Sequence, residues 1–226
     1  MEFKIVKTTD KFKEGNKYFE KEKARLAEII QFEKKWYTKG FELIAGIDEA
    51  GRGPLAGPVV AGAVILPKGL IIEGVNDSKK LSEKKRDTLY SIIVKEALCW
   101  GVGIVDNNII DEINVLNAAK MAMKIAVSQL KFKPEVLLID AEKLDIPEVR
   151  QEAIIKGDAK SISIAAASII AKVTRDRIIE EYDKKFPDYG FAKHKGYGTA
   201  EHMEAIREKG LCEIHRKTFT KNIINN

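Results

Sequence analysis

The stretch that decides the fold runs from Ile44 to Leu66 and reads IAGIDEAGRGPLAGPVVAGAVIL. Two acids, Asp48 and Glu49, interrupt its first apolar half. Burying an ionised carboxylate without a partner costs several kcal/mol or forces its protonation. We therefore expect these acids to have a counter-charge or to face water. An arginine boxed by glycines follows them, as Gly51, Arg52 and Gly53.

The composition is that of a soluble globular protein. Of the 226 residues, 45% are hydrophobic and 32% are charged. The longest apolar run, Ile162–Ala171, is broken by serines and is too short to span a bilayer, so no membrane partner is expected. The two cysteines form neither a metal-type pair nor a disulfide framework. This usage indicates a reducing, cytoplasmic location.

Most of the net charge lies in the first 40 residues. This segment holds 11 Lys and Arg against 7 Asp and Glu, which accounts for +4 of the chain's net charge of +5. Its apolar spacing over residues 16–39 is loosely helical, and Gly40 is a plausible stop. Two interpretations stay open: a helix packed on the rest of the protein, or a basic arm that grips a phosphate backbone. We treat residues 1–40 as an extension and residues 41–226 as the main domain.

The order of the remaining elements predicts one α/β domain with a mixed five-stranded sheet flanked by helices. Apolar runs predict strands, and periodic runs predict helices. The predicted strands are residues 41–48, 58–66, 99–105, 135–140 and 151–156. The predicted helices are residues 83–96, 114–130 and 162–183.

The glycine-rich turn is not a nucleotide-binding loop. A dinucleotide fingerprint needs a helix N-terminus directly after its glycines, to meet the pyrophosphate. Here strand-like residues follow Gly57 instead. The turn between Gly51 and Gly53 is better explained by a backbone that approaches another group closely.

Four acids fall at the ends of predicted elements, where loops gather at one edge of a sheet. Clustered carboxylates repel one another, and oxygen ligands favour Mg²⁺ or Mn²⁺. Two such ions about 4 Å apart can clamp the attacking and leaving oxygens of a phosphodiester. Helix capping is the competing interpretation for the last of these acids, which precedes a helix. The four are Asp48, Glu49, Asp140 and Asp158.

Several motifs together resemble those of bacterial ribonuclease HII. They are GIDEAGRGPLAGPVVAGAVIL, NDSKKLS (76–82), LLID (137–140), GDAKSISIAAASIIAKVTRD (157–176) and HKGYGT (194–199). The resemblance covers residues 41–215 in the family's order. It implies a ribonuclease H-like fold with a helical C-terminal part. It also implies an endonuclease that cuts the RNA strand of RNA–DNA hybrids and nicks 5′ of single ribonucleotides in duplex DNA, leaving 3′-hydroxyl and 5′-phosphate ends.

On this resemblance the four acids bind two metal ions, Mg²⁺ or Mn²⁺. Gly51, Arg52 and Gly53 match the loop that contacts the 2′-hydroxyl, and Tyr197 matches the tyrosine that packs against the following deoxyribose. The residue types add two basic candidates for phosphate contact, Lys79 and His194. The i, i+4 spacing near Asp176 instead indicates a charged helix face, comprising Lys172, Arg175 and Asp176.

The resemblance also implies roles in ribonucleotide excision repair and primer removal, and we expect a monomer. Two alternatives are weighed: a ribonuclease HIII-like enzyme, which lacks the arginine between the glycines, and a module that binds hybrids without cutting them. If the N-terminal segment is a binding arm, removing residues 1–39 weakens hybrid binding more than it slows the chemistry.

Overall fold

A mixed five-stranded sheet forms the centre of the computed structural model, which describes residues 4–224. The strand order is β5-β3-β2-β6-β7. β3 is antiparallel to both of its neighbours, whereas β2, β6 and β7 run parallel to one another. The strands are β2 (Ile44–Ala50), β3 (Val59–Ile65), β5 (Cys99–Val105), β6 (Val136–Asp140) and β7 (Arg150–Ile154).

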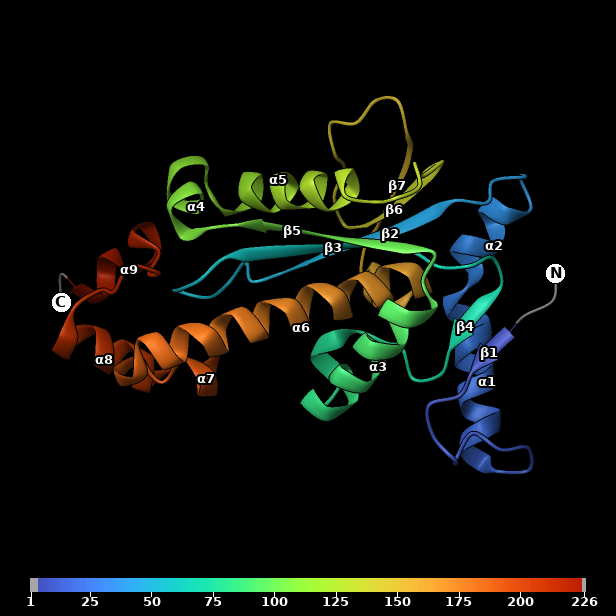
Figure 1. Cartoon of the computed structure of the whole chain (residues 1–226), viewed down its shortest axis with the longest axis horizontal. Helices are drawn as coiled ribbons and strands as arrows, with labels where there is room; N and C mark the ends of the chain where they lie inside the picture. Colours follow the sequence, from blue (N-terminus) through green and yellow to red (C-terminus); the bar gives the residue numbers. More distant parts are fainter. Residues whose placement is uncertain (1–3, 225–226) are drawn as a thin grey trace.

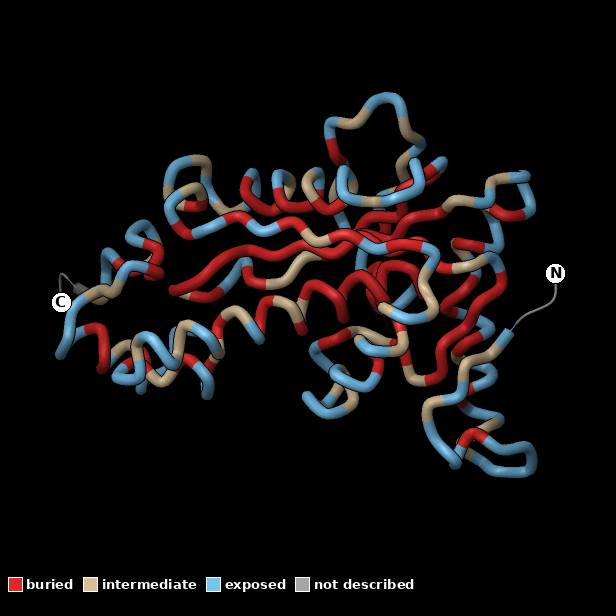
Figure 2. Tube along the Cα trace, viewed as in Figure 1, coloured by how far each residue is buried: buried red, intermediate tan, exposed pale blue. Residues whose placement is uncertain are grey.

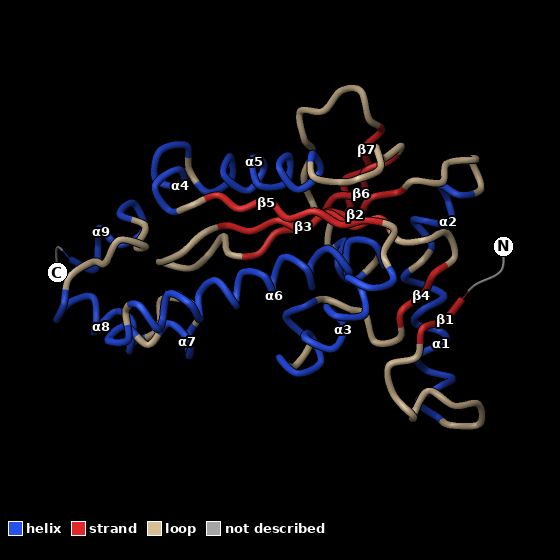
Figure 3. Tube along the Cα trace, in the orientation of Figure 1, coloured by secondary structure: helices blue, strands red, loops and turns tan. Residues whose placement is uncertain are grey.

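Helices cover both faces of this sheet (Figures 1 and 3). α6 (Ile162–Lys185) and α3 (Glu83–Glu96) lie on one face, and α5 (Val115–Ser128) and α4 (Asn107–Ile113) lie on the other. Every residue of β3 is therefore buried, and Figure 2 shows the buried central strands between partly exposed helices. The α/β class, the mixed five-stranded sheet and its flanking helices are confirmed.

Two small residues let α6 lie directly on the sheet. A Cβ placed on Gly46 would lie 2.0 Å from the carbonyl carbon of Ser163, and one on Gly62 would lie 2.5 Å from the carbonyl oxygen of Ala167. No side chain other than hydrogen fits at either position. This close approach brings the first turns of α6 next to the acid-bearing end of β2.

The N-terminal segment packs on the domain. β1 (Lys4–Val6) pairs in parallel with β4 (Leu70–Ile72), and the expected helical stretch forms two helices, α1 (Lys17–Ile29) and α2 (Gln31–Tyr37). The buried side chain of Leu26 belongs to the same apolar cluster as residues of α3 and α6. The packed arrangement is thus present, while duplex binding by the exposed lysines stays a prediction.

Short helices at the opposite end of the molecule form the expected helical C-terminal part (Figure 1). They are the 3₁₀ helix η3 (Pro187–Tyr189) and the α-helices α7 (Phe191–His194), α8 (Ala200–Lys209) and α9 (Lys217–Ile224). Within residues 4–224, no helix combines the length and apolar character needed to cross a membrane.

Candidate active site

Two neighbouring strands bring three of the predicted acids to one edge of the sheet. β2 and β6 are parallel, with Ile47 opposite Ile139. The next residue of each strand is an acid, so Asp48 lies beside Asp140, and Glu49 follows Asp48 on β2. The Glu49 amide donates a 2.7 Å hydrogen bond to Asp48 Oδ1.

The fourth acid lies on the short turn that precedes α6. Asp158 belongs to the 3₁₀ helix η2 (Gly157–Ala159) and is buried. The Gly157 amide donates a 2.6 Å hydrogen bond to Asp140 Oδ1, which ties this turn to the end of β6. All four predicted acids therefore belong to one edge of the sheet, although they are up to 110 residues apart in sequence.

Burial and neighbouring charges raise the pKa of three of these carboxylates. Burial raises the pKa of Asp48 well above its usual value, and the charge of Glu49 raises it further. The pKa of Glu49 is also raised by burial, against the lowering effect of Arg52, whose Nη1 lies 3.3 Å from Glu49 Oε1. Burial raises the pKa of Asp158 as well, followed by the charges of Asp77 and Asp140. This edge holds more negative charge than its protein neighbours neutralise.

The donor set fits a hard divalent cation. All four side chains offer carboxylate oxygens, and Glu49 Oε2 is buried without a hydrogen-bond partner among the described residues. In that part of the chain, no three His, Cys, Asp or Glu side chains are gathered closely enough to hold a metal ion as they stand. A bound cation would therefore draw the carboxylates together while it removes their repulsion.

Five of the six predicted substrate residues line one pocket together with Glu49 and Asp140. The pocket has a volume of about 310 Å³. Tyr197 is 42% exposed there, and a Cβ placed on Gly53 would lie 3.6 Å from Tyr197 Cε1. The tyrosine ring and the glycine loop thus face the same space. The lining residues are Glu49, Ala50, Gly51, Arg52, Gly53, Ser78, Lys79, Asp140, Lys172 and Tyr197.

Lys79 also belongs to this acidic edge. It lies on the 3₁₀ helix η1 (Ser78–Lys80), which Asp77 caps by accepting a 2.9 Å hydrogen bond from the Lys79 amide. Burial alone would lower the pKa of Lys79, but the carboxylates of Asp48 and Asp158 raise it above its ordinary value. The ammonium group is therefore a cation at the rim of the acid cluster.

Comparison with known proteins decides the family. The model of the family described as Ribonuclease HII matches residues 45–222. The chain belongs to the ribonuclease HII family. Ribonuclease HII of Acetivibrio thermocellus is 59% identical over 221 residues, covering 98% of this chain and 86% of that protein. Ribonuclease H2 of Pyrococcus horikoshii OT3 matches with a TM-score of 0.66 and 30% identity, over 80% of this chain and 97% of that one.

A more distant structure, Bst-RNase HIII in complex with Mn²⁺, shares the fold at a TM-score of 0.62 and 22% identity, over 81% of this chain and 70% of that one. Membership of the ribonuclease HII family makes this chain a ribonuclease H, a metal-dependent endonuclease that hydrolyses phosphodiester bonds in RNA–DNA hybrids. The ribonuclease HIII-like and non-cleaving alternatives are therefore set aside.

His194 does not line this pocket. Its side chain is only 8% exposed, its Nε2 lies 2.8 Å from the carbonyl oxygen of Tyr189, and its Nδ1 accepts a hydrogen bond from the Gly196 amide. Both ring nitrogens are thus bonded to backbone. The prediction that His194 faces a phosphate does not agree with this position. The basic residues beside it in the sequence suggested an exposed loop, and the local sequence does not reveal that the histidine side chain folds inward.

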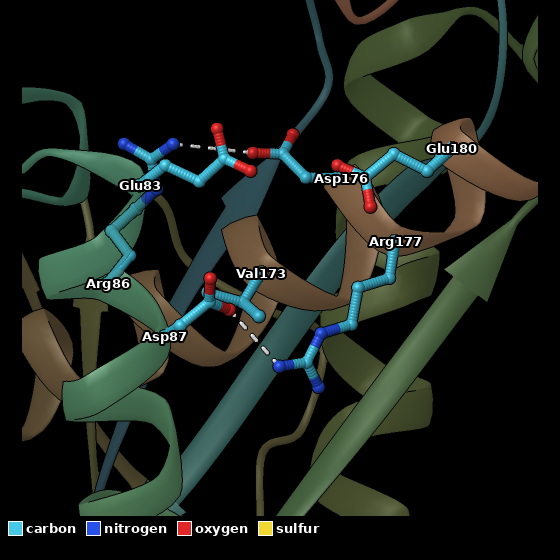
Figure 4. A pocket seen from close by; sticks show the side chains of 7 residues that line it. All are labelled: Glu83, Arg86, Asp87, Val173, Asp176, Arg177 and Glu180. Carbon is cyan, nitrogen blue, oxygen red and sulfur yellow. Dashed lines mark hydrogen bonds and ion pairs between the residues drawn. The ribbon is translucent and has the colours of Figure 1, made fainter. Parts of the chain in front are cut away.

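Lys172 lines the pocket instead of lying on a charged outer face. Its Nζ donates a 2.7 Å hydrogen bond to Asp176, and Asp176 also pairs with Arg86 at 3.6 Å. Figure 4 shows Arg86 and Asp176 meeting across a second, charged pocket between α3 and α6. Arg86 Nη1 in turn donates to the carbonyl oxygens of Leu81 and Ser78. This chain of contacts ties Lys172 to the η1 segment that carries Lys79.

Sequence reasoning also missed a serine pair and two buried arginines. The hydroxyl oxygens of Ser78 and Ser168 lie 2.9 Å apart and join η1 to α6, and Ser168 also hydrogen-bonds Asp48. Arg175 and Arg216 are both buried behind the glycine loop. The sequence predicted Arg175 on a charged helix face, and no motif marked Arg216. The i, i+4 pattern that indicated a surface helix could not reveal this burial.

Proposed function

We propose that this ribonuclease HII nicks on the 5′ side of single ribonucleotides in duplex DNA, as well as cutting longer hybrids. The observation that carries the proposal is the shared pocket, in which two of the four acids, Glu49 and Asp140, line the same space as the Gly51–Gly53 loop and Tyr197. Cleavage chemistry and ribose recognition would then act on adjacent nucleotides.

The four acids would hold the metal, with Asp48 central because β2 lies between β3 and β6. Two divalent cations, Mg²⁺ or Mn²⁺, would supply activation of a water and neutralise charge on the leaving 3′-oxygen. Lys79 and Lys172 are placed to balance the charge of the phosphates on either side. The products would carry a 3′-hydroxyl and a 5′-phosphate.

Recognition of the ribonucleotide would rest on the glycine loop and the tyrosine. The 2′-hydroxyl distinguishes RNA from DNA at a single position. Arg52 and Gly53 are exposed, so their backbone can approach that hydroxyl, and the Arg52 side chain can hold an adjacent phosphate. The exposed Tyr197 ring is free to pack against the next deoxyribose.

The test uses an end-labelled DNA duplex with one embedded ribonucleotide. The wild type is expected to make one nick 5′ of the ribonucleotide with Mg²⁺ or Mn²⁺, and none in the matched all-DNA duplex. Asp48→Asn should bind the duplex without nicking it. If the wild type cut long hybrids but left the single ribonucleotide intact with both metals, the family activity would stand and the proposed junction recognition would be wrong.

The biological setting is part of the same proposal. Nicking at single ribonucleotides would place the enzyme in ribonucleotide excision repair and primer removal. Both cysteines are free thiols, which supports a reducing compartment such as the cytoplasm. The monomeric state and the binding of duplex by the lysines of residues 1–40 remain predictions.

A further inference from the structure

Two arginines are buried behind the glycine loop without an acidic partner. Arg175 is 1% exposed and Arg216 is fully buried. Arg175 lies in the middle of α6, and Arg216 lies directly before α9. Over residues 4–224, neither guanidinium forms an ion pair with a carboxylate. A buried charge normally has such a partner, so its absence requires an explanation.

The guanidinium groups bond instead to backbone carbonyls of the loop that begins at Gly51. Arg216 donates to the carbonyl oxygens of Gly51 (2.6 Å), Arg52 (3.0 Å) and Gly57 (2.9 and 3.0 Å). Every nitrogen of its fork therefore has an acceptor in this one loop. The planar fork fixes both the distance and the angle of the carbonyls it holds.

Arg175 holds the other end of the same loop and reaches a second one. It donates to the carbonyl oxygens of Pro58 (3.0 Å) and Ala56 (3.1 Å). Its Nη1 donates to the carbonyl oxygen of Lys195 (3.0 Å), two residues before Tyr197. The glycine loop and the tyrosine loop, which are about 140 residues apart in sequence, thus bond to one pair of side chains.

The loop lies in direct contact with these side chains. A Cβ placed on Gly51 would lie 2.3 Å from Arg175 Nε, and Gly51 has a φ of +99°. Burial, followed by the charge of Arg175, lowers the pKa of Arg216 to about 9. Holding two like charges together in this way is costly, and an apolar core could have supported a loop without that cost. A geometric requirement on the loop explains why arginines are used.

That requirement follows from the planarity of the peptide bond. In a trans peptide the carbonyl of one residue and the N–H of the next point in opposite directions. Arg216 draws the carbonyls of Gly51 and Arg52 inward, so the N–H groups of Arg52 and Gly53 must point outward. Both residues are exposed on the pocket that holds the acids and Tyr197.

We infer that Arg216 is a positioning residue for ribose recognition, which aims the amides of Arg52 and Gly53 at the 2′-hydroxyl of the substrate. Arg175 sets the distance between these amides and the Tyr197 loop through its bond to Lys195. The inference rests on the proposed junction recognition and deepens it. Neither arginine touches the substrate, and both act through the backbone that they hold.

The test compares binding of two duplexes of one sequence, with and without a single ribonucleotide, in EDTA so that neither is cut. The wild type should prefer the ribonucleotide duplex. Arg216→Lys keeps the charge but loses the fork, and should reduce this preference about 10-fold, since aimed hydrogen bonds to the hydroxyl are lost. Its Kd for the all-DNA duplex should stay unchanged. Arg177→Lys, on the exposed side of α6, is the matched control.

The outcomes separate positioning from simple support of the fold. A merely structural arginine would weaken binding of both duplexes equally, and that result would overturn the inference. If Arg216→Lys failed to fold, Arg175→Lys and rescue of Arg216→Ala by methylguanidine would give the same comparison. Restored preference with methylguanidine supports positioning, and unrestored preference in folded protein overturns it. A wild type without any preference would overturn the proposed ribose recognition itself.

Discussion

Two groups of buried charge flank the substrate pocket, and they differ in how their charge is compensated. Burial, followed by neighbouring charge, raises the pKa of Asp48, burial raises that of Glu49, and Glu49 Oε2 has no partner among the described residues. The two arginines behind the glycine loop donate to six carbonyl oxygens. The acid cluster therefore keeps negative charge that the fold does not compensate, whereas the arginine pair is satisfied within the fold.

The difference shows how to distinguish a reactive site from its support. Unsatisfied like charges cost folding free energy and are retained where a ligand completes them. Charges that bond fully to backbone add rigidity instead, because the planar fork fixes its acceptors. Uncompensated carboxylates and a pair of arginines that holds the backbone in place thus lie close to one pocket.

The largest expected effect is on the acid side. Asp48→Asn should lower the single-turnover cleavage rate by on the order of 1,000-fold, because a residue that holds the metal is worth several kcal/mol of transition-state stabilisation. The same variant should lose the rise in melting temperature that Mn²⁺ gives the wild type. Thermal melts with and without Mn²⁺ measure this, and a variant with the full Mn²⁺ shift would remove Asp48 from the metal site.

For the arginine pair, the next largest effect is expected on the free energy of unfolding when Arg216 is replaced by an apolar side chain of similar length. Arg216→Met should lower the free energy of unfolding by about 3 kcal/mol, because buried carbonyl oxygens lose their donors. Urea denaturation followed by circular dichroism measures the change. An unchanged midpoint would mean that water replaces the guanidinium, and the contrast with the acid cluster would disappear.

The histidines beside this pair illustrate a third case, a titratable group that is buried and neutral. Burial, followed by the charge of His202, lowers the pKa of His215 to about 4. The unfolded state therefore binds more protons between about pH 6.5 and pH 4, so stability should fall by about 3 kcal/mol as pH drops through that range. His215→Asn should flatten this part of the curve, which urea midpoints at pH 7 and pH 5 would show.

A smaller effect is expected where the N-terminal segment meets α6. Glu33 on α2 is 2% exposed, and its Oε1 accepts hydrogen bonds from the Ser161 hydroxyl (2.5 Å) and the Ser163 amide (3.0 Å). Glu33→Ala should cost about 2 kcal/mol by leaving these donors unpaired. Glu33→Gln keeps an acceptor and removes a carboxylate whose pKa burial raises, so its unfolding midpoint should match or exceed that of the wild type.

Because the N-terminal segment packs on the domain, a deletion of residues 1–39 cannot by itself test whether that segment binds duplex. Removing residues 1–39 would expose the apolar cluster that Leu26 helps to cover, so weaker hybrid binding would not identify a binding arm. Replacing exposed lysines of α1 with glutamine keeps the packing and tests the arm directly. A lower salt dependence of duplex binding supports the arm, and an unchanged one rejects it.

The smallest expected effect is on the stability of the metal-free acid cluster. Without metal, Asp48→Asn should raise the unfolding free energy by about 1 kcal/mol, because it removes one of the mutually repelling carboxylates. Arg216→Met changes stability in the opposite direction. Urea unfolding midpoints measured in EDTA compare the two variants directly: the midpoint should rise for Asp48→Asn and fall for Arg216→Met. A lower midpoint for Asp48→Asn would show that the acids are satisfied within the fold.

The sequence alone indicated the five strands of the central sheet, the three long helices that flank it and the grouping of acids at strand ends. Residues 83–96 were predicted as a helix and form α3, and residues 99–105 were predicted as a strand and form β5. Hydrophobic periodicity is a local property, so it can be read along the chain. Acids that end buried strands could be grouped for the same reason, because strand ends gather at the edge of a sheet.

Tertiary structure alone decided which charged groups lie inside. Arg216 meets the carbonyls of a loop about 160 residues away, His194 turns its ring inward, and Lys172 faces the pocket rather than solvent. Burial and hydrogen-bond partners depend on segments far apart in the chain, and no local pattern records them. The acids at the edge of the sheet could therefore be found from the sequence, whereas the arginines that hold the glycine loop could be found only from the fold.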